Sequence, residues 1–463
     1  MRIRGVSLVV LLAISGFASL ARAAERANVL FIFADDLNTH LGSYGHPQAK
    51  TPNLDELAAR GLRFDRAFSQ FPLCNPSRVS MLTGLRPDTA GVAGQERHFR
   101  EAARPDVITL PQLFRRNGYH VVGLGKVFHT GLDDTGSWDE RLVPRRPEGR
   151  RKAPAIHLTP TRGIPAAGLS YRIAEGSAED ELDGVMAAQA IAILERNRDR
   201  PFFLAVGFHQ PHAPYTATQE YFDLHPLDGI TLPDEPLRHR GTLPPAAILS
   251  TAPYPNFDLP RSRLREAKRA YYAAVSFLDA QVGKLLDALQ RLELADRTIV
   301  VFWSDHGYHL GEHGLWLKNS LFEEATRVPL IIAAPGRARA RACTRTVELL
   351  DLYPTLAALA GLDPPRGLEG ASLVPLLDDP ATTWGRPAYS QVWRGTYAGR
   401  SVRTERWRYT EWDGGRQGRE LYDHEVDPNE YRNLAGDPAY AVVVEELRGL
   451  LRSRRGAKSG RRP

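Results

Sequence analysis

Five short apolar runs, each about as long as a β-strand, constrain the fold of this chain most strongly. The runs are continuous rather than alternating, which is typical of strands that are buried on both faces of a sheet. Helical stretches lie between them, and strands that alternate with helices predict an α/β fold whose mostly parallel sheet is covered on both faces. The strands are expected at Asn28–Ala34, Val121–Leu124, Phe202–Gly207, Thr298–Trp303 and Leu330–Ala334, and the helices at Leu54–Arg60, Leu110–Arg116, Leu182–Arg196 and Ala270–Leu292.

Polar side chains follow four of these strands at the point where each strand ends. In open α/β sheets, ligands bind outside the carboxyl ends of the strands. We therefore expect these side chains to gather at one edge of the sheet. In chain order they are Asp35 and Asp36, then Lys126 and His129, then His209 and His212, and finally Asp305 and His306.

The segment Cys-Asn-Pro-Ser-Arg at positions 74–78 is expected to begin a helix. Pro76 fits the first helical position, because its missing N–H has no partner to lose there. Gly84 is expected to end the helix. Cys74 would then lie at a helix N-terminus, where unpaired N–H groups and the helix dipole favour an anion. Arg78, one turn in, could offer bidentate donors to the same anion.

The chain has two cysteines, Cys74 and Cys343. Read alone, Cys74 is equally compatible with an ordinary buried cysteine before a helix. A disulfide between the two would consume the thiol at 74, so this pairing and a reactive Cys74 exclude one another. We expect Cys343 to be a free, buried thiol.

Both ends of the chain differ from the body. Residues 1–23 combine Arg2 and Arg4, an apolar stretch and an Ala-Arg-Ala site, which predicts a cleaved signal peptide and a periplasmic or secreted protein. No other run is long and apolar enough to cross a bilayer. Residues 452–463 form a basic tail, expected to be disordered. Without these ends the formal charge of +6 becomes slightly negative, which argues against a nucleic-acid partner.

The body is expected to contain a catalytic domain at residues 24–375 and a smaller α+β subdomain at 376–451. Residues 133–180 and 224–261 are rich in Pro, Gly or charged residues, lack a clear period and are interpreted as rim loops around an entrance. From about Gly385 the pattern changes to short alternating strands and one helix, which predicts a small antiparallel sheet with a covering helix. Its elements are expected at Ala388–Trp393, Ser401–Trp412, Glu420–Asp423 and Ala441–Leu451.

Two histidine patterns suggest zinc. His309-x-x-Glu312-His313 matches an inverted zincin motif, but that motif needs a helix, and three interspersed glycines disfavour one. His209 and His212 could form a zinc pair, but no third soft ligand lies nearby in the sequence. A metalloprotease is therefore disfavoured.

Taken together, the motifs resemble those of the type I sulfatases, and most closely the iduronate-2-sulfatase-like branch. The matching stretches occur in the family's order along the whole chain. They are Asp35–Leu37, Cys74–Arg86, Gly125–His129, Gly207–His212, Ser304–Gly307, Gly311–Gly314 with Lys318, and Glu420–Asp423 with Asp427-Pro428. The resemblance implies an alkaline-phosphatase/sulfatase-like sandwich: a large, mostly parallel sheet flanked by helices, and a small C-terminal antiparallel sheet with a helix.

The resemblance also implies a modified residue and a metal. In this family a maturation enzyme oxidises the cysteine of the motif, here Cys74, to formylglycine, whose hydrate is the nucleophile. Asp35, Asp36 and Asp305 offer hard oxygen ligands, which suit Ca²⁺, with Mg²⁺ as second choice. The resemblance adds His306 and the formylglycine at 74 as ligands.

The resemblance further implies roles in the hydrolysis of sulfate esters. Arg78 would stabilise charge beside the metal, and Lys126 and Lys318 would hold the sulfate. His212 would bind sulfate and protonate the leaving oxygen, and His129 would act as the base that releases sulfate from residue 74. The implied substrate is a sulfated carbohydrate with a 2-O-sulfated uronic acid.

One departure and two alternatives remain. Tyr308 stands where the iduronate branch tends to have Trp, which leaves the substrate preference open. A phosphonate or phosphodiester hydrolase of the same fold would use the same formylglycine and metal. A non-catalytic protein that binds sulfated glycans would retain an unmodified Cys74.

Overall fold

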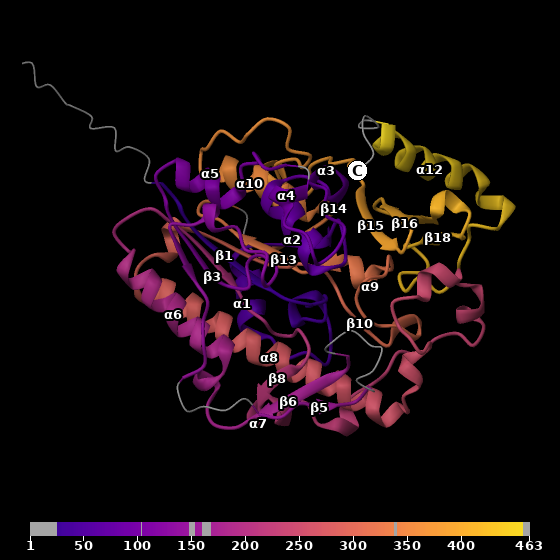
Figure 1. The fold of residues 1–463 in the computed structure, drawn as a ribbon, viewed down its shortest axis with the longest axis horizontal. Helices are drawn as coiled ribbons and strands as arrows, with labels where there is room; N and C mark the ends of the chain where they lie inside the picture. The colour runs from indigo at the N-terminus through magenta and orange to yellow at the C-terminus, as the bar shows by residue number, and fades with distance from the viewer. Residues whose placement is uncertain (1–25, 103, 148–152, 160–167, 338–339, 457–463) are drawn as a thin grey trace, which may run out of the picture.

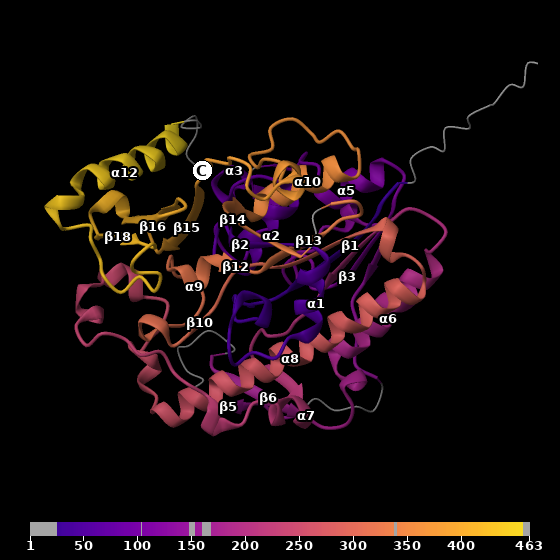
Figure 2. The same ribbon diagram turned by 180° about the vertical axis from the view of Figure 1, so that it is seen from behind.

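A nine-stranded mixed sheet forms the centre of the protein, with helices on both faces (Figures 1 and 2). The computed structural model describes residues 26–102, 104–147, 153–159, 168–337 and 340–456. The predicted signal peptide and the last seven residues of the predicted tail lie outside the described residues. The strands follow the order β12 (Arg327–Val328), β2 (Leu62–Phe68), β13 (Leu330–Ala333), β9 (Thr298–Ser304), β1 (Asn28–Ala34), β7 (Phe202–Gly207), β3 (His120–Gly125) and β4 (Glu140–Leu142), and β14 (Arg341–Glu348) pairs with β2 off this path.

The middle of this sheet confirms the predicted parallel arrangement. Strands β9, β1, β7, β3 and β4 are parallel neighbours. The fifth predicted strand, β13, is present but runs antiparallel to β9 and β2. Strand β2 was not predicted, because its charged residues alternate with apolar ones and interrupt the apolar run that marks the other strands.

Side chains of β1 alternate between two hydrophobic cores. Leu30 and Ile32 pack with α1 (Pro52–Arg60), α6 (Leu182–Arg196) and α8 (Arg261–Arg291). Phe31 and Phe33 face the other side, which is covered by α2 (Cys74–Thr83), α5 (Leu110–Arg116) and α10 (Leu352–Leu359). Helix α8 begins nine residues before the predicted start, because buried Leu264 and Ala267 continue its apolar face toward the N-terminus. The two cores hold β1 rigidly and fix the position of the residues that follow it.

The predicted rim loops contain some regular structure. A three-stranded sheet of β5 (Ile156–His157), β6 (Ser170–Ala174) and β8 (Tyr215–Thr218) lies beside α8 and α7 (Gln219–Asp223). The remaining short α-helices and strands of the protein lie outside these two loops. They are α3 (Pro87–Ala90), α4 (Phe99–Ala102), β10 (His309–Leu310), β11 (Trp316–Leu317), α9 (Glu323–Thr326) and α11 (Val374–Asp378).

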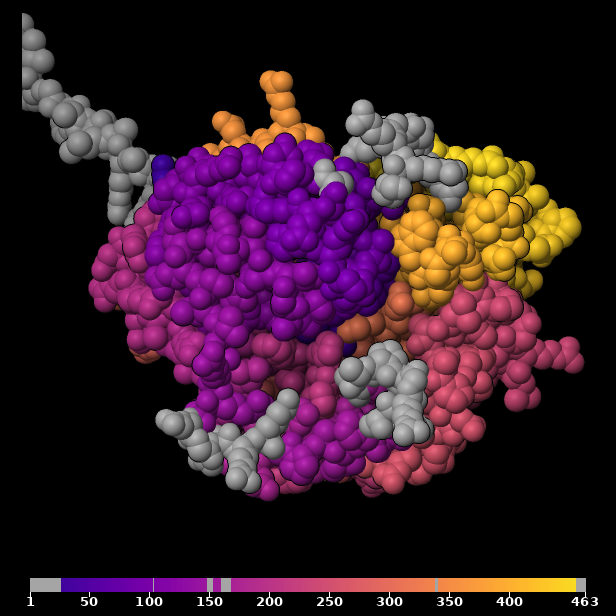
Figure 3. Space-filling model, viewed as in Figure 1, coloured from indigo at the N-terminus to yellow at the C-terminus, as the bar shows by residue number. Residues whose placement is uncertain are grey.

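The predicted C-terminal antiparallel sheet and its covering helix are confirmed; one face of the sheet packs against the main body and the helix covers the other, and this part of the chain adjoins the main body in Figure 3. The sheet consists of β15 (Ala388–Arg394), β16 (Tyr397–Arg403), β17 (Trp407–Trp412) and β18 (Arg419–Asp423), and α12 spans Ala441–Gly456. The expected single strand at 401–412 is wrong, because a turn divides it: the Thr404 N–H donates to the Trp407 carbonyl, and the Trp407 N–H donates to the Thr404 side-chain hydroxyl. Helix α12 also extends into the start of the predicted disordered tail. The domain boundary at 375/376 stays a prediction.

None of the helices among the described residues is both long enough and apolar enough to cross a membrane.

Candidate active site

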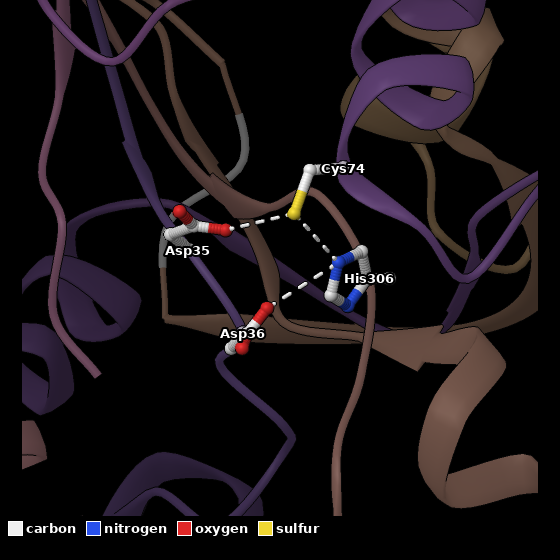
Figure 4. A group of neighbouring side chains, drawn as sticks. All are labelled: Asp35, Asp36, Cys74 and His306. Carbon is white, nitrogen blue, oxygen red and sulfur yellow. Dashed lines mark hydrogen bonds and ion pairs between the residues drawn. The ribbon is translucent and has the colours of Figure 1, made fainter. Parts of the chain in front are cut away.

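The polar residues that follow the parallel strands lie together at one edge of the sheet, beside the start of α2. Asp35 and Asp36 follow β1, and Asp305 and His306 follow β9. All four are almost fully buried. This placement agrees with the expectation drawn from the strand ends, and it brings Cys74 into the same group from a different layer of the fold (Figure 4).

Asp36 has a strained backbone. Its φ is 70°, in the left-handed region that non-glycine residues rarely adopt. The hydroxyl of Tyr271, from α8, donates to the Asp36 carbonyl at 2.8 Å and accepts from the Asn38 amide at 3.0 Å. Sequence reasoning missed Tyr271, because a buried tyrosine in a long helix gives no signal of its contacts. The helix therefore holds Asp36 in a conformation that aims its carboxylate at the cluster.

Cys74 lies at the N-terminus of α2, as predicted. Its Sγ is 3.4 Å from Asp35 Oδ1 and 3.5 Å from His306 Nε2 (Figure 4). The prediction that Pro76 opens the helix is wrong, since the helix begins at Cys74 itself. Pro76 still falls within the first turn, where backbone N–H groups have no partner in the helix. Gly84, with φ of 67°, ends the helix as expected.

The environment of Cys74 does not suit an ordinary thiolate. Burial, with Asp35 adding to it, raises the pKa of the thiol to about 12. An unmodified Cys74 is therefore protonated at neutral pH and a poor nucleophile. Both cysteines are free and buried, which confirms the prediction for Cys343.

Arg78 connects two of the acidic residues. Its Nε donates to Asp305 Oδ2 at 2.8 Å, and its Nη2 lies 3.3 Å from Asp35 Oδ1. Nη1 donates to the Lys126 carbonyl. The side chain is fully buried, and Nη2 has no hydrogen-bond partner among the described residues. Arg78 thus holds the two carboxylates of Asp305 and Asp35 in place beside residue 74.

Two lysines flank Cys74 from opposite sides of the cluster. Lys126 Nζ donates to Asp35 and lies 4.0 Å from the Cys74 sulfur. Lys318 Nζ donates to Asp36 Oδ1 at 2.5 Å and lies 3.5 Å from the same sulfur. Gly125 makes the position of Lys126 possible: its φ is 75°, and a Cβ there would lie 2.4 Å from the Gly207 carbonyl.

These lysines and Arg78 also control the charge on the carboxylates. Burial alone would raise the pKa of Asp35, but Lys126 and Arg78 reverse this and hold it well below its usual range. The pKa of Asp36 is likewise lowered, because Lys318 and His212 outweigh its burial. Both carboxylates are therefore ionised at neutral pH.

The two predicted proton-transfer histidines occupy different positions. His212 Nδ1 donates to the Ala213 carbonyl at 2.7 Å, and its Nε2 lies 3.9 Å from Asp36 Oδ2. His129 is half-buried, and its Nδ1 has no partner in the described part of the chain. Burial, with Lys126 and Arg78, lowers the pKa of His129 to about 4. His129 is therefore neutral at pH 7 and free to accept a proton.

His209 does not join His212 in a zinc pair. Its Nδ1 lies 3.4 Å from Asp183 Oδ1, whereas His212 faces Asp36. Asp183, near the start of α6, also accepts the backbone N–H groups of His209 and Gln210 at 2.9–3.1 Å. It anchors the loop that carries His212. Sequence reasoning missed Asp183, because nothing in its local sequence separates it from a surface acid.

The donor set fits a hard divalent cation. Ligand atoms of Asp35, Asp36, Cys74 and His306 all lie within 4.8 Å of one another. His306 Nδ1 donates to the Gly307 carbonyl at 3.0 Å, so the lone pair of Nε2 faces Asp36 Oδ1 at 3.4 Å and Asp305 Oδ1 at 3.7 Å. A cation between these atoms would satisfy a lone pair that carboxylates cannot.

The inverted zincin pattern does not form a zincin site. It lies on a hairpin of β10 and β11 rather than on a helix. His309 Nε2 is 2.6 Å from Ser320 Oγ, whereas His313 Nδ1 is 2.8 Å from His239 Nε2. This confirms that the glycines prevent the helix which the motif requires.

Comparisons with known proteins agree with this geometry. The family model described as "Sulfatase" matches residues 27–362, and that of the "N-sulphoglucosamine sulphohydrolase, C-terminal" region matches residues 311–457. The chain is 35% identical to the iduronate 2-sulfatase of Homo sapiens over 516 aligned positions, which cover 89% of this chain and 92% of the human one.

Solved structures show the same fold. A phosphonate monoester hydrolase of Agrobacterium radiobacter superposes with a TM-score of 0.78 at 24% identity, covering 93% of this chain and 96% of that one. A 2-O GAG sulfatase superposes with a TM-score of 0.74 at 26% identity, covering 93% and 92%. The fold is therefore of the alkaline-phosphatase/sulfatase type, and, with a family model that matches most of its length, the chain belongs to the sulfatase family of sulfuric ester hydrolases.

Proposed function

We propose that the protein is an exported sulfatase that hydrolyses a sulfate ester of a sulfated glycan, with formylglycine at position 74 as the nucleophile and a divalent metal beside it. The observation that carries this proposal is the position of Cys74. Its side chain lies at a helix N-terminus, next to Asp35 and His306, with Lys318 3.5 Å and Lys126 4.0 Å from the sulfur. Such a position suits a group that must bind an anion and a cation together.

Each side chain of the cluster has a separate role in the proposed reaction. Formylglycine at 74 would supply the hydroxyl that attacks sulfur, and the metal would polarise the sulfate oxygens. Lys126 and Lys318 hold the sulfate, and the Arg78 guanidinium stabilises charge near the nucleophile. Because the Nδ1–H of His212 is held by a carbonyl, His212 protonates the leaving oxygen through Nε2 only in its doubly protonated, imidazolium form. His129, neutral at pH 7, accepts the proton that frees the sulfate.

The substrate that we propose is a glycan containing a 2-O-sulfated uronic acid. This rests on similarity to a human iduronate 2-sulfatase and to a 2-O GAG sulfatase. The departure at Tyr308 does not oppose it. Tyr308 is fully buried behind Asp36, and its hydroxyl is 2.8 Å from that of Tyr215. A residue in that position shapes the support of the metal site rather than the substrate opening.

Export and maturation are part of the proposal. Residues 1–23 have the pattern of a signal peptide, so we propose that the mature protein acts in a periplasm or outside the cell. The conversion of Cys74 requires a formylglycine-generating enzyme in the producing cell. Mass spectrometry of the peptide that contains residue 74, from protein made by such a cell, should show an aldehyde. An intact thiol there would favour the non-catalytic glycan binder.

The reaction itself is tested by a substrate panel. Initial rates on defined sulfated oligosaccharides should be highest when a terminal uronic acid carries a 2-O-sulfate. Aryl sulfate should be hydrolysed faster than aryl phosphonate under the same conditions. The reverse order would favour the phosphonate hydrolase, and no turnover of any sulfate ester by aldehyde-containing protein would contradict the proposal.

The pH dependence of the base follows from His129. Because the pKa of this residue is lowered to about 4, its neutral form predominates above that pH. Because this base acts after the ester alcohol has left, we expect kcat to stay level as the pH falls to about 5, and to decline as the pH falls through about 4. His129→Ala should reduce kcat by about 10²- to 10⁴-fold, the usual contribution of a general base. An acid limb centred near 6.5 would contradict this assignment.

The metal is expected to be Ca²⁺. Protein treated with a chelator should lose activity and recover more of it with Ca²⁺ than with Mg²⁺, because Mg²⁺ demands a regular octahedron of oxygen ligands at short distances. The measurement is activity and bound metal after each ion is added back. Greater recovery with Mg²⁺ would reverse the assignment without affecting the rest of the site.

A further inference from the structure

The tip of the β10–β11 hairpin is built around His313, a residue that the proposed reaction does not use. The base of this hairpin adjoins the active site, since His306 precedes β10 and Lys318 follows β11. His313 is fully buried and has a φ of 58°, a strained conformation for a residue other than glycine. Its strain indicates that contacts of the side chain hold the tip in place.

Three parts of the chain surround this side chain. The ring of His313 stacks on Phe322, with ring centroids 3.9 Å apart. Its Nδ1 is 2.8 Å from Nε2 of His239, in the segment between β8 and α8. The other nitrogen of His239 is 2.8 Å from the carbonyl of Tyr431, which follows β18 (Figures 1 and 2). The hairpin tip is thereby linked to the C-terminal subdomain.

The positions of the ring protons follow from these contacts. The Tyr431 carbonyl can only accept, so His239 Nδ1 carries a proton. The short contact between the two rings needs one more proton, because two lone pairs would repel each other at 2.8 Å. The remaining nitrogen, His313 Nε2, lies 3.4 Å from Glu324 Oε2. Neither of these last two atoms has a hydrogen-bond partner among the described residues.

A bare lone pair on His313 Nε2 would face a carboxylate, so a positive charge belongs between them. A third ring proton supplies it and gives the histidine pair one positive charge. A divalent metal is less suitable, because among the described acids around His313 the carboxylates of Glu430 and Glu235 already have other donors, which leaves Glu324 Oε2 as the oxygen without a hydrogen bond. Glu430 is already bound to Arg408 and His424, and Glu235 to Arg240 and the Gly314 amide. At the catalytic cluster, by contrast, several carboxylates face His306.

We propose that His239 and His313 form a charged histidine pair that is paired with Glu324 of α9 and that, through the Tyr431 carbonyl, fastens the hairpin carrying Lys318 to the C-terminal subdomain. His313 is then a positioning residue for the proposed sulfatase reaction, on which this part of the inference rests. The charge of the pair does not depend on what the enzyme hydrolyses.

The electrostatic surroundings of the pair agree with this assignment. Burial alone would lower the pKa of His313, but Glu324, Glu430 and Glu235 outweigh it and raise the pKa above its usual value. Stability from the pair is therefore fully present below about pH 6.5 and is lost as the pH rises through the raised pKa. Among the described residues, the titratable and charged groups around the pair are Glu235, Arg240, Tyr254, His309, Glu324, Glu420, Asp427, Glu430 and Tyr431.

The sharpest test is Glu324→Gln in the full-length protein. The glutamine amide can donate to a neutral His313 Nε2, so this variant should hold the hairpin without the charge. We expect its Tm to be below that of the unmodified sequence by a few degrees at about pH 6, and this difference to vanish by about pH 9. In the unmodified sequence, kcat/KM should fall as the pH rises and the pair loses its charge. In Glu324→Gln this fall at alkaline pH should move by roughly half a pH unit or more. Glu425→Gln, which removes an exposed carboxylate paired with Arg406, is the matched control and should change neither.

Direct observation completes the test. In ¹⁵N-histidine NMR at about pH 7, both nitrogens of His313 should be protonated in the unmodified sequence and Nε2 unprotonated in E324Q. A neutral His313 in the unmodified sequence, or a Tm difference that does not change with pH, would overturn the charged pair. The charged pair would also be overturned, in favour of a metal, if the unmodified protein bound a second divalent ion per chain and E324Q did not. A charged pair with an unmoved alkaline limb would overturn the positioning role alone.

Discussion

Cys74→Ala is expected to abolish sulfate release, with a loss on the order of 10⁵-fold or more in kcat. The reason is that the side chain at 74 supplies the nucleophile, and no neighbouring group can replace it. Asp35 and His306 would remain beside the empty position but cannot form the same covalent link to sulfur. The measurement is turnover of the best substrate from the oligosaccharide panel.

The fold of this variant should be intact, because a protonated thiol among carboxylates contributes little stability. The matched control is Cys343→Ala, which removes the other buried cysteine, a residue of β14 whose side chain lies in the hydrophobic core. That variant should keep its kcat within about twofold while losing roughly 1 kcal/mol of stability to the small cavity. Turnover by Cys74→Ala close to that of the control would remove the nucleophile assignment.

Asp305→Ala is expected to lose bound metal and activity together, and also to unfold at a lower temperature. Asp305 lies beside His306 and accepts from Arg78 Nε at 2.8 Å. Its removal leaves the Arg78 guanidinium fully buried with one partner fewer, and breaking a buried pair in this way typically costs about 3–5 kcal/mol. Elemental analysis, turnover and thermal unfolding measure the three effects.

Two further variants separate metal loss from instability. Asp305→Asn keeps the size of the side chain and one oxygen, so it should lose less stability than the alanine variant but still bind metal weakly. Asp378→Ala removes an exposed carboxylate paired with Arg337 and should leave all three measurements unchanged. Full activity in Asp305→Ala, or in wild-type protein stripped of metal by a chelator, would count against a metal at this site.

Much of the catalytic domain could be predicted from local patterns. The buried parallel strands were recognised because each is a continuous apolar run, and helices α5 and α6 have the predicted bounds. Strand β2 was missed because Arg63, Asp65 and Arg66 interrupt its apolar residues. The turn at Thr404 was missed because the segment Thr404-Glu405-Arg406 contains no glycine, proline, asparagine or aspartate to mark a turn. Such errors arise where tertiary contacts outweigh local propensity.

The sequence by itself determined which groups would meet at the edge of the sheet, because parallel strands fix where their carboxyl ends lie. It also determined the family, since several spaced motifs occur in one order. Only the tertiary structure decided how the charges are balanced: Arg78 between Asp35 and Asp305, Tyr271 holding the strained Asp36, and His313 joined to Glu324. Two of these pairings, Arg78 with Asp305 and Tyr271 with Asp36, join residues more than 200 positions apart, and no local pattern encodes such contacts.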